Sequence, residues 1–149
     1  MLDTIKVNVV KNSLRAFFEE IIDEKDLKVS VYEEHWSLRL HIENKGKLIV
    51  AITMVFHWPI VFLSDFKIEL PWNTVKTIDF LYNLIEKSAN IFGHSVMIGT
   101  VLPHSSVKAT LMENDWVWIT GVKVPDGPEN INVYYKNLKE KKPKGLSDD

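Results

Sequence analysis

The sequence predicts an α+β fold with a mostly antiparallel central sheet of about seven strands and about three flanking helices. Its 149 residues are 46% hydrophobic, which is enough for one buried core. Several short segments alternate apolar with polar residues, as half-buried strands do. One long helical segment lies between two strands, as the crossover of a parallel pair requires. Residues 1–138 are therefore expected to form one domain, and the charged residues 139–149 a frayed tail.

The N-terminal segment is predicted to be a strand followed by a helix. Ile5, Val7 and Val9 alternate with polar residues, which favours a strand over residues 4–10. Asn12 or Ser13 is then expected to cap a helix. The buried stripe of that helix has apolar residues at helical spacing: Leu14, Phe17, Phe18, Ile21 and Ile22.

Three antiparallel strands are predicted next. Residues 36–43 and 48–56 form a hairpin around the turn at 44–47, and residues 60–70 form the third strand, which ends before Pro71. The second strand is apolar on both faces, so layers are expected on both sides of it. Strict alternation in the third strand would place two sets on opposite faces: Ile60, Phe62, Ser64, Phe66, Ile68 and Leu70 against Val61, Leu63, Asp65, Lys67 and Glu69.

The C-terminal half is predicted to begin with the long helix. Asn73 or Thr74 caps it and Gly93 closes it after residue 92. A strand over 95–101, a short helix to about Asn114, and strands over 116–124 and 131–138 follow. The long helix implies that the strands over 60–70 and 95–101 are parallel neighbours.

Composition excludes several kinds of protein. The chain has no cysteine, and its net charge of −2 gives no general attraction to nucleic acid or to anionic membranes. The longest apolar run, residues 48–56, is too short to span a bilayer, and the N-terminus lacks the apolar centre of a signal peptide. We therefore expect a soluble, cytoplasmic protein. No metal site is expected, because the histidines lack ligand spacing: His41, His57, His94 and His104.

Two carboxylates are candidates for general-base catalysis. Asp65 and Glu69 are four residues apart, or roughly 13 Å along a strand, so they are too far apart to share a proton. Either could deprotonate an amine, with Glu69 the better placed. The alternative is that both belong only to the polar face of a strand. The five tryptophans could likewise stack on nucleobases, but packing in a core or a ligand groove is favoured for them.

The order of elements resembles the GCN5-related N-acetyltransferase (GNAT) superfamily. The likeness is most specific over residues 45–116. Residues 45–51 are similar to the family's turn and third strand, residues 74–92 to its long cofactor helix, and residues 101–116 to its strand-five exit and fourth helix. Small, divergent acetyltransferase-like proteins of bacteriophages look closest. The resemblance implies that the parallel strands splay apart at their C-terminal ends.

The resemblance implies a cofactor, acetyl-coenzyme A, and the residues that would contact it. These are Phe66 and Ile68 on the strand, Asn73, Thr74 and Lys76 at the start of the long helix, and His104. The helix N-terminus would hold the pyrophosphate.

The chain departs from the family pattern twice. Residues 71–76 contain no glycine, and Leu111 stands where the family often has a proton-donating tyrosine. The resemblance thus implies an acetyl-CoA-dependent N-acyltransferase or a divergent relative of one. The alternatives are a catalytically silent GNAT-like module that binds protein, such as a phage assembly or host-interaction factor, and a small nucleic-acid-binding domain.

Overall fold

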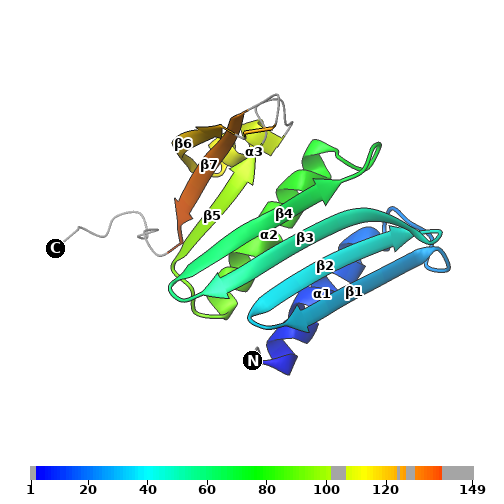
Figure 1. The fold of residues 1–149 in the computed structure, drawn as a ribbon. Helices are drawn as coiled ribbons and strands as arrows, with labels where there is room; N and C mark the ends of the chain where they lie inside the picture. The colour runs from blue at the N-terminus through cyan, green and yellow to red at the C-terminus, as the bar shows by residue number, and fades with distance from the viewer. Residues whose placement is uncertain (1–2, 102–106, 124, 127–129, 139–149) are drawn as a thin grey trace, which may run out of the picture.

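The computed structural model describes residues 3–101, 107–123, 125–126 and 130–138. In this part of the chain a seven-stranded sheet has the order β1-β2-β3-β4-β5-β7-β6, and three helices accompany it (Figure 1). All neighbouring strands are antiparallel except β4 and β5, which are parallel. The predicted α+β fold with one parallel pair is therefore confirmed. The elements in chain order are α1 Thr4–Phe18, β1 Leu27–Glu34, β2 Ser37–Asn44, β3 Lys47–His57, β4 Ile60–Ile68, α2 Val75–Ile91, β5 Val96–Val101, α3 Val107–Glu113, β6 Val117–Lys123 and β7 Asn130–Asn137.

The predicted strand over residues 4–10 is wrong, because this segment is the first half of α1. Asp3 caps the helix, and its Oδ1 accepts hydrogen bonds from the Ile5 N–H at 2.8 Å and the Lys6 N–H at 3.4 Å. The β-branched residues favour a strand locally, but Val10, Leu14 and Phe18 continue one helical stripe into the core. The Ser13 hydroxyl donates to the Val9 carbonyl inside this helix instead of capping it.

Strand β1 is absent from the sequence prediction, and it restores the expected number of strands. It pairs antiparallel with β2 from Leu27 opposite Asn44 to Glu34 opposite Ser37. Its burial alternates weakly, because it is the edge strand and only Val29 is fully buried. A half-wet edge strand carries little hydrophobic periodicity, so its sequence pattern gives a weak signal.

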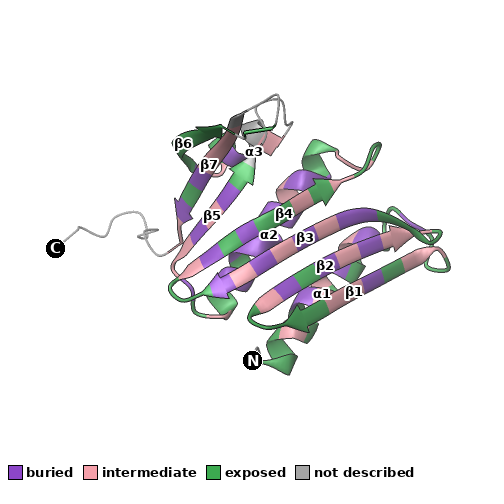
Figure 2. Cartoon of the chain, viewed as in Figure 1, coloured by how far each residue is buried: buried purple, intermediate pink, exposed green. Residues whose placement is uncertain are grey.

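Helices α1 and α2 lie side by side on one face of the sheet (Figure 1). The Phe17 and Phe80 rings stack between them at 4.0 Å. The expectation of layers on both faces of β3 is wrong, because from Val50 to Phe56 only alternate residues are fully buried (Figure 2). Its other face, with Ala51 and Thr53, is half-buried, and no described helix covers it.

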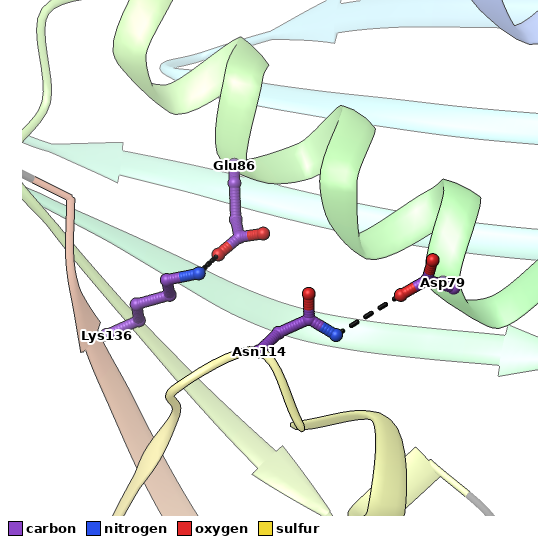
Figure 3. Close-up of polar contacts among 4 residues, drawn as sticks. All are labelled: Asp79, Glu86, Asn114 and Lys136. Carbon is purple, nitrogen blue, oxygen red and sulfur yellow. Dashed lines mark hydrogen bonds and ion pairs between the residues drawn. The ribbon is translucent and has the colours of Figure 1, made fainter. Parts of the chain in front are cut away.

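Two polar contacts tie α2 to the C-terminal part of the sheet (Figure 3). The buried Lys136 ammonium on β7 contacts the Glu86 carboxylate on α2. Two turns further toward the helix start, the side-chain amide of Asn114, which lies between α3 and β6, donates to Asp79 at 3.2 Å. Because a charge buried without its partner is costly, the ion pair fixes how α2 sits against β7.

Removing one member of this ion pair should destabilise the protein strongly. Lys136→Met leaves the Glu86 carboxylate buried and alone, so the free energy of unfolding should fall by about 3–5 kcal/mol in urea denaturation. The matched double variant Lys136→Met/Glu86→Leu replaces both charges with apolar groups and should recover most of the loss. Equal destabilisation of the single and double variants would contradict this role.

The turn after α2 places a histidine in the core. Gly93 adopts φ +81°, and the His94 N–H donates to the Ala89 carbonyl at 2.9 Å. The His94 ring packs against Phe56 at 5.0 Å and its Nδ1 lies 3.1 Å from the Phe92 carbonyl. Burial lowers the pKa of His94, and the backbone contact opposes this only in part.

Stability should therefore decrease in mild acid. With the folded-state pKa lowered, the unfolded chain binds more protons than the native one below about pH 6.5, so the free energy of unfolding rises with pH through that window. Denaturant unfolding at pH 5 and pH 7.5 measures this difference. His94→Phe should show a smaller difference than the wild type, and an unchanged difference would refute the assignment.

Candidate functional site at the split between β4 and β5

The central feature of the sheet is a split between its two parallel strands. β4 and β5 pair from Ile60 opposite Val96 to Leu63 opposite Gly99, and the pairing stops there. β4 nevertheless continues to Ile68, while β5 goes on pairing with β7 (Figure 1). Among the described residues, the β4 backbone beyond Leu63 therefore has no strand partner on its β5 side.

A β-bulge accounts for the position of the split. The register between β3 and β4 shifts between Thr53 and Met54, which leaves Ser64 as the extra residue. A bulge bends its strand and increases its twist, so β4 turns away from β5 at this point. The extra residue also moves every later side chain of β4 to the other face of the sheet. The strict alternation expected for this strand is therefore wrong.

Aromatic side chains fill the helix side of the split. Phe66 of β4 stacks on Tyr82 of α2 at 4.5 Å, and Tyr82 meets Trp116 edge to face at 5.7 Å. A Cβ added to Gly99 would lie 3.6 Å from Leu63 and 3.7 Å from Trp116, so Trp116 lies across β5. Desolvation raises the pKa of the Tyr82 hydroxyl, which keeps this group neutral. The cluster thus forms an apolar floor.

The first turn of α2 lies at the open end of the split, because α2 follows directly after β4. The Thr74 hydroxyl accepts from the Thr77 N–H at 3.2 Å, as predicted for a cap, and Val75 and Lys76 are exposed. In the described chain the N–H groups of Val75 and Lys76 have no acceptor. Trp72, in the loop without glycine, packs against the core.

The structure brings most of the predicted site residues to this end of the sheet. Phe66 and Ile68 are half-buried and share the helix-covered face with Val61 and Leu63. Asp65 is exposed on the opposite face, opposite Thr53, and Glu69 is exposed just beyond the strand. The remaining residues lie as follows: Asn73 is half-buried, Thr74 and Lys76 are exposed, His104 lies outside the described residues, and Leu111 is 1% exposed in the core.

Sequence reasoning missed the bulge and the packing of Phe66, Tyr82 and Trp116 into one aromatic floor. Trp116 was expected to pack in a core or a ligand groove, and Tyr82 falls on the apolar register of the long helix. The available signal for the bulge was the change from apolar to polar residues at Ser64 and Asp65, which alternation alone does not locate. No group of acidic or histidine residues in the described ranges could hold a metal ion, and none of their helices is long and apolar enough to cross a membrane.

Comparison with solved structures identifies the architecture as the GNAT-like fold. The chain matches the yncA protein of Salmonella typhimurium, an assigned acetyltransferase solved with its cofactor acetyl-CoA, with TM-score 0.56 and 13% identity over 70% of this chain and 66% of that one. Nourseothricin acetyltransferase matches with TM-score 0.59 and 8% identity, over 76% and 85% of the two chains. The ribosomal L7/L12 α-N-protein acetyltransferase RimL, in complex with coenzyme A, gives 0.55 and 9%, over 68% and 62%.

These matches show that the chain shares a fold with these proteins, but they do not show that it belongs to their family. The chain spans just under two thirds of the length of the yncA and RimL chains. No protein-family model and no curated protein sequence matches it. The chain therefore has the fold of acetyl-CoA-dependent N-acetyltransferases. Because the sequence identities are low, its chemistry has to be argued from the residues of the site.

Proposed function

We propose that this protein binds acetyl-coenzyme A, or a related acyl-coenzyme A, in the split and transfers the acyl group to an amine. One observation carries the proposal: β4 extends past its last β5 partner, Leu63, and leaves a backbone edge open over an apolar floor. The yncA and RimL structures that share this fold contain acetyl-CoA and coenzyme A, respectively.

The open edge of β4 suits the extended arm of the cofactor. That arm contains two amides, and an extended amide chain can add to a free strand edge through backbone hydrogen bonds. The bulge makes this edge available from Asp65 to Ile68. Phe66 and Ile68 face the helix side, where Tyr82 and Trp116 provide apolar surface. The residues present therefore fit the arm without a rearrangement of the sheet.

The first turn of α2 is the proposed place for the pyrophosphate. The N–H groups of Val75 and Lys76 are directed out of the helix start, where the helix dipole favours an anion. The exposed Lys76 ammonium adds a full positive charge, and Asn73 and Thr74 add polar side chains beside it. Lys76 and these two residues would replace the glycine-rich contacts that the loop lacks. The assignment of His104 to the same site stays a prediction.

The bound cofactor would supply an activated acyl thioester. The task for this chain is then to accept a proton from the attacking amine, which we assign to Glu69, with Asp65 as the second carboxylate. Leu111 donates no proton, so protonation of the departing sulfur would fall to water. The likeness to bacteriophage proteins stays a prediction about origin.

Loss of the Lys76 charge should weaken cofactor binding. Lys76→Ala removes one charge-assisted contact, so calorimetric titration with coenzyme A and with acetyl-CoA should show about a tenfold or greater loss of affinity. The matched control is Lys87→Ala, an exposed lysine on the other half of α2, which should bind like the wild type. Binding indifferent to Lys76 would place the pyrophosphate elsewhere. No binding by the wild type would favour the silent protein-binding module.

Replacement of the proposed base should slow transfer more than it weakens binding. Glu69→Gln should lower the rate of coenzyme A release from acetyl-CoA, measured with a panel of primary amines, while the affinity for coenzyme A changes little. Asp65→Asn is the control and should have the smaller effect on rate. Equal and mild effects of both changes on an active enzyme would return the two carboxylates to a role as strand surface.

A further inference from the structure

A second cavity lies at the opposite end of the sheet from the split, where β2 and β4 begin. It has a volume of about 520 Å³, within the range of small-molecule sites. Four separate parts of the chain contribute to it: the start of α1, the β1–β2 turn, the β3–β4 turn and the end of α2. Its lining residues are Asp3, Lys6, Trp36, Phe56, His57, Trp58, Phe92 and His94.

Two exposed tryptophans line this cavity, although exposure of so much apolar surface opposes folding. Trp36 is 62% exposed and Trp58 is 72% exposed. In the described chain neither indole contacts another aromatic ring, so their faces are available to a ligand. Phe56 and Phe92, packed edge to face at 5.3 Å, form the inner wall. The cavity therefore combines a fixed apolar wall with two unused stacking faces.

The backbone at Trp36 gives an independent sign of function. His35 and Trp36 form the two-residue turn between β1 and β2, with φ of 42° and 63°. Hairpin turns with positive φ at both central positions strongly favour Asn-Gly, because other side chains are strained there. A tryptophan in this position is unfavourable both for the turn and for its own hydration. Strain of this kind is found at binding sites, where function maintains it.

Both tryptophan-bearing turns are held in place by backbone hydrogen bonds. The Phe56 N–H donates to the Trp36 carbonyl at 2.7 Å. The Pro59 carbonyl, next to Trp58, accepts from the N–H groups of Ser95 at 2.9 Å and Val96 at 3.2 Å. The backbone of the two turns is thus held in place before any ligand arrives, which lowers the entropic cost of binding.

The polar groups of the cavity indicate a neutral ligand with both donors and acceptors. Asp3 and Lys6 contribute opposite charges, and Lys6 forms no ion pair within the described chain. The two side-chain charges balance, so net side-chain charge favours neither a phosphate nor a quaternary ammonium. The Asp3 carboxylate accepts hydrogen bonds, the Lys6 ammonium donates them, and the His57 imidazole does both. A planar heterocycle with hydrogen-bonding edges matches this set together with two stacking faces.

We propose that this cavity is a nucleobase site, with Trp36 and Trp58 as its stacking platforms and Asp3, Lys6 and His57 at the base edge. The base can come from a free nucleoside or nucleotide, or from an unpaired base of a single strand. The site is separate from the split, and the proposal does not depend on the binding of coenzyme A there.

Calorimetric titration with adenosine, AMP and a six-residue oligo(dA) tests the proposal. Adenosine and AMP should bind with affinities within about threefold of each other, because the charges of the cavity cancel. Trp58→Ala should weaken adenosine binding about tenfold, as loss of one stacking face does. Trp36→Gly should weaken binding by as much, yet raise the denaturation midpoint, because glycine suits the turn. This opposite effect on binding and stability excludes misfolding as the cause.

Three controls separate this site from others. Trp118→Ala removes a tryptophan that is 54% exposed on β6, away from the cavity, and should bind adenosine like the wild type. Trp58→Phe keeps an aromatic face and should retain most of the affinity. Coenzyme A also contains adenine, so adenosine could in principle bind at the split instead of the cavity. Lys76→Ala changes the split alone and should therefore leave adenosine binding unchanged.

Each result decides for or against the site. Tighter binding of oligo(dA) than of AMP, with the same dependence on Trp36 and Trp58, supports the site and identifies a single strand as its source; equal binding supports it with a free nucleotide. No adenosine binding at millimolar concentration, or binding indifferent to both tryptophans, overturns the proposal. AMP binding more than tenfold tighter than adenosine overturns it as well, as does binding of glucose or maltose in place of adenosine.

Discussion

The early end of the parallel pairing between β4 and β5 is the constraint on which the rest of the structure depends. Beyond Leu63 and Gly99 the sheet divides, and the bulge at Ser64 turns β4 away from the shorter β5. Within the described chain β4 and β5 do not pair beyond this point, so the split relies on packing against another element. α2 provides that support, because Phe66 packs on it from one side and the Glu86–Lys136 pair binds it to the other.

The two ends of the sheet differ in how they could recognise a ligand. At the split, the strand edge offers backbone groups and the start of α2 offers N–H groups, with the exposed Lys76 ammonium and the Asp65 and Glu69 carboxylates nearby. At the other end, side chains dominate, and the charges of Asp3 and Lys6 oppose each other. α2 runs from one end of the sheet to the other. Its start therefore lies at the split, and Phe92 and His94, which follow its end, line the second cavity.

The sequence predicted the fold well where apolar periodicity agrees with the positions of turn, cap and strand-ending residues. The hairpin of β2 and β3, the Thr74 cap, the turn at Gly93 and the parallel crossover all combine a periodic segment with a breaker. Prediction failed at the N-terminus because β-branched residues imitate a strand while Val10 and Leu14 obey a helical period set by tertiary packing. It failed at Ser64 because a bulge changes the face of every later residue without changing composition.

The candidate site was predictable in part, and the loop before α2 shows the limit. Helix-start chemistry could be inferred from Thr74 and Lys76, because capping and charge are local properties. A phosphate can approach the start of α2 only if the side chains of the glycine-free loop leave it accessible. The large side chain in that loop is Trp72. This indole packs against the core, and the Thr74 hydroxyl is engaged with Thr77, whose N–H it accepts from and whose hydroxyl it donates to. The N–H groups of Val75 and Lys76 have no acceptor in the described chain, so under the proposed function a loop without glycine would still offer an anion two backbone donors and one ammonium.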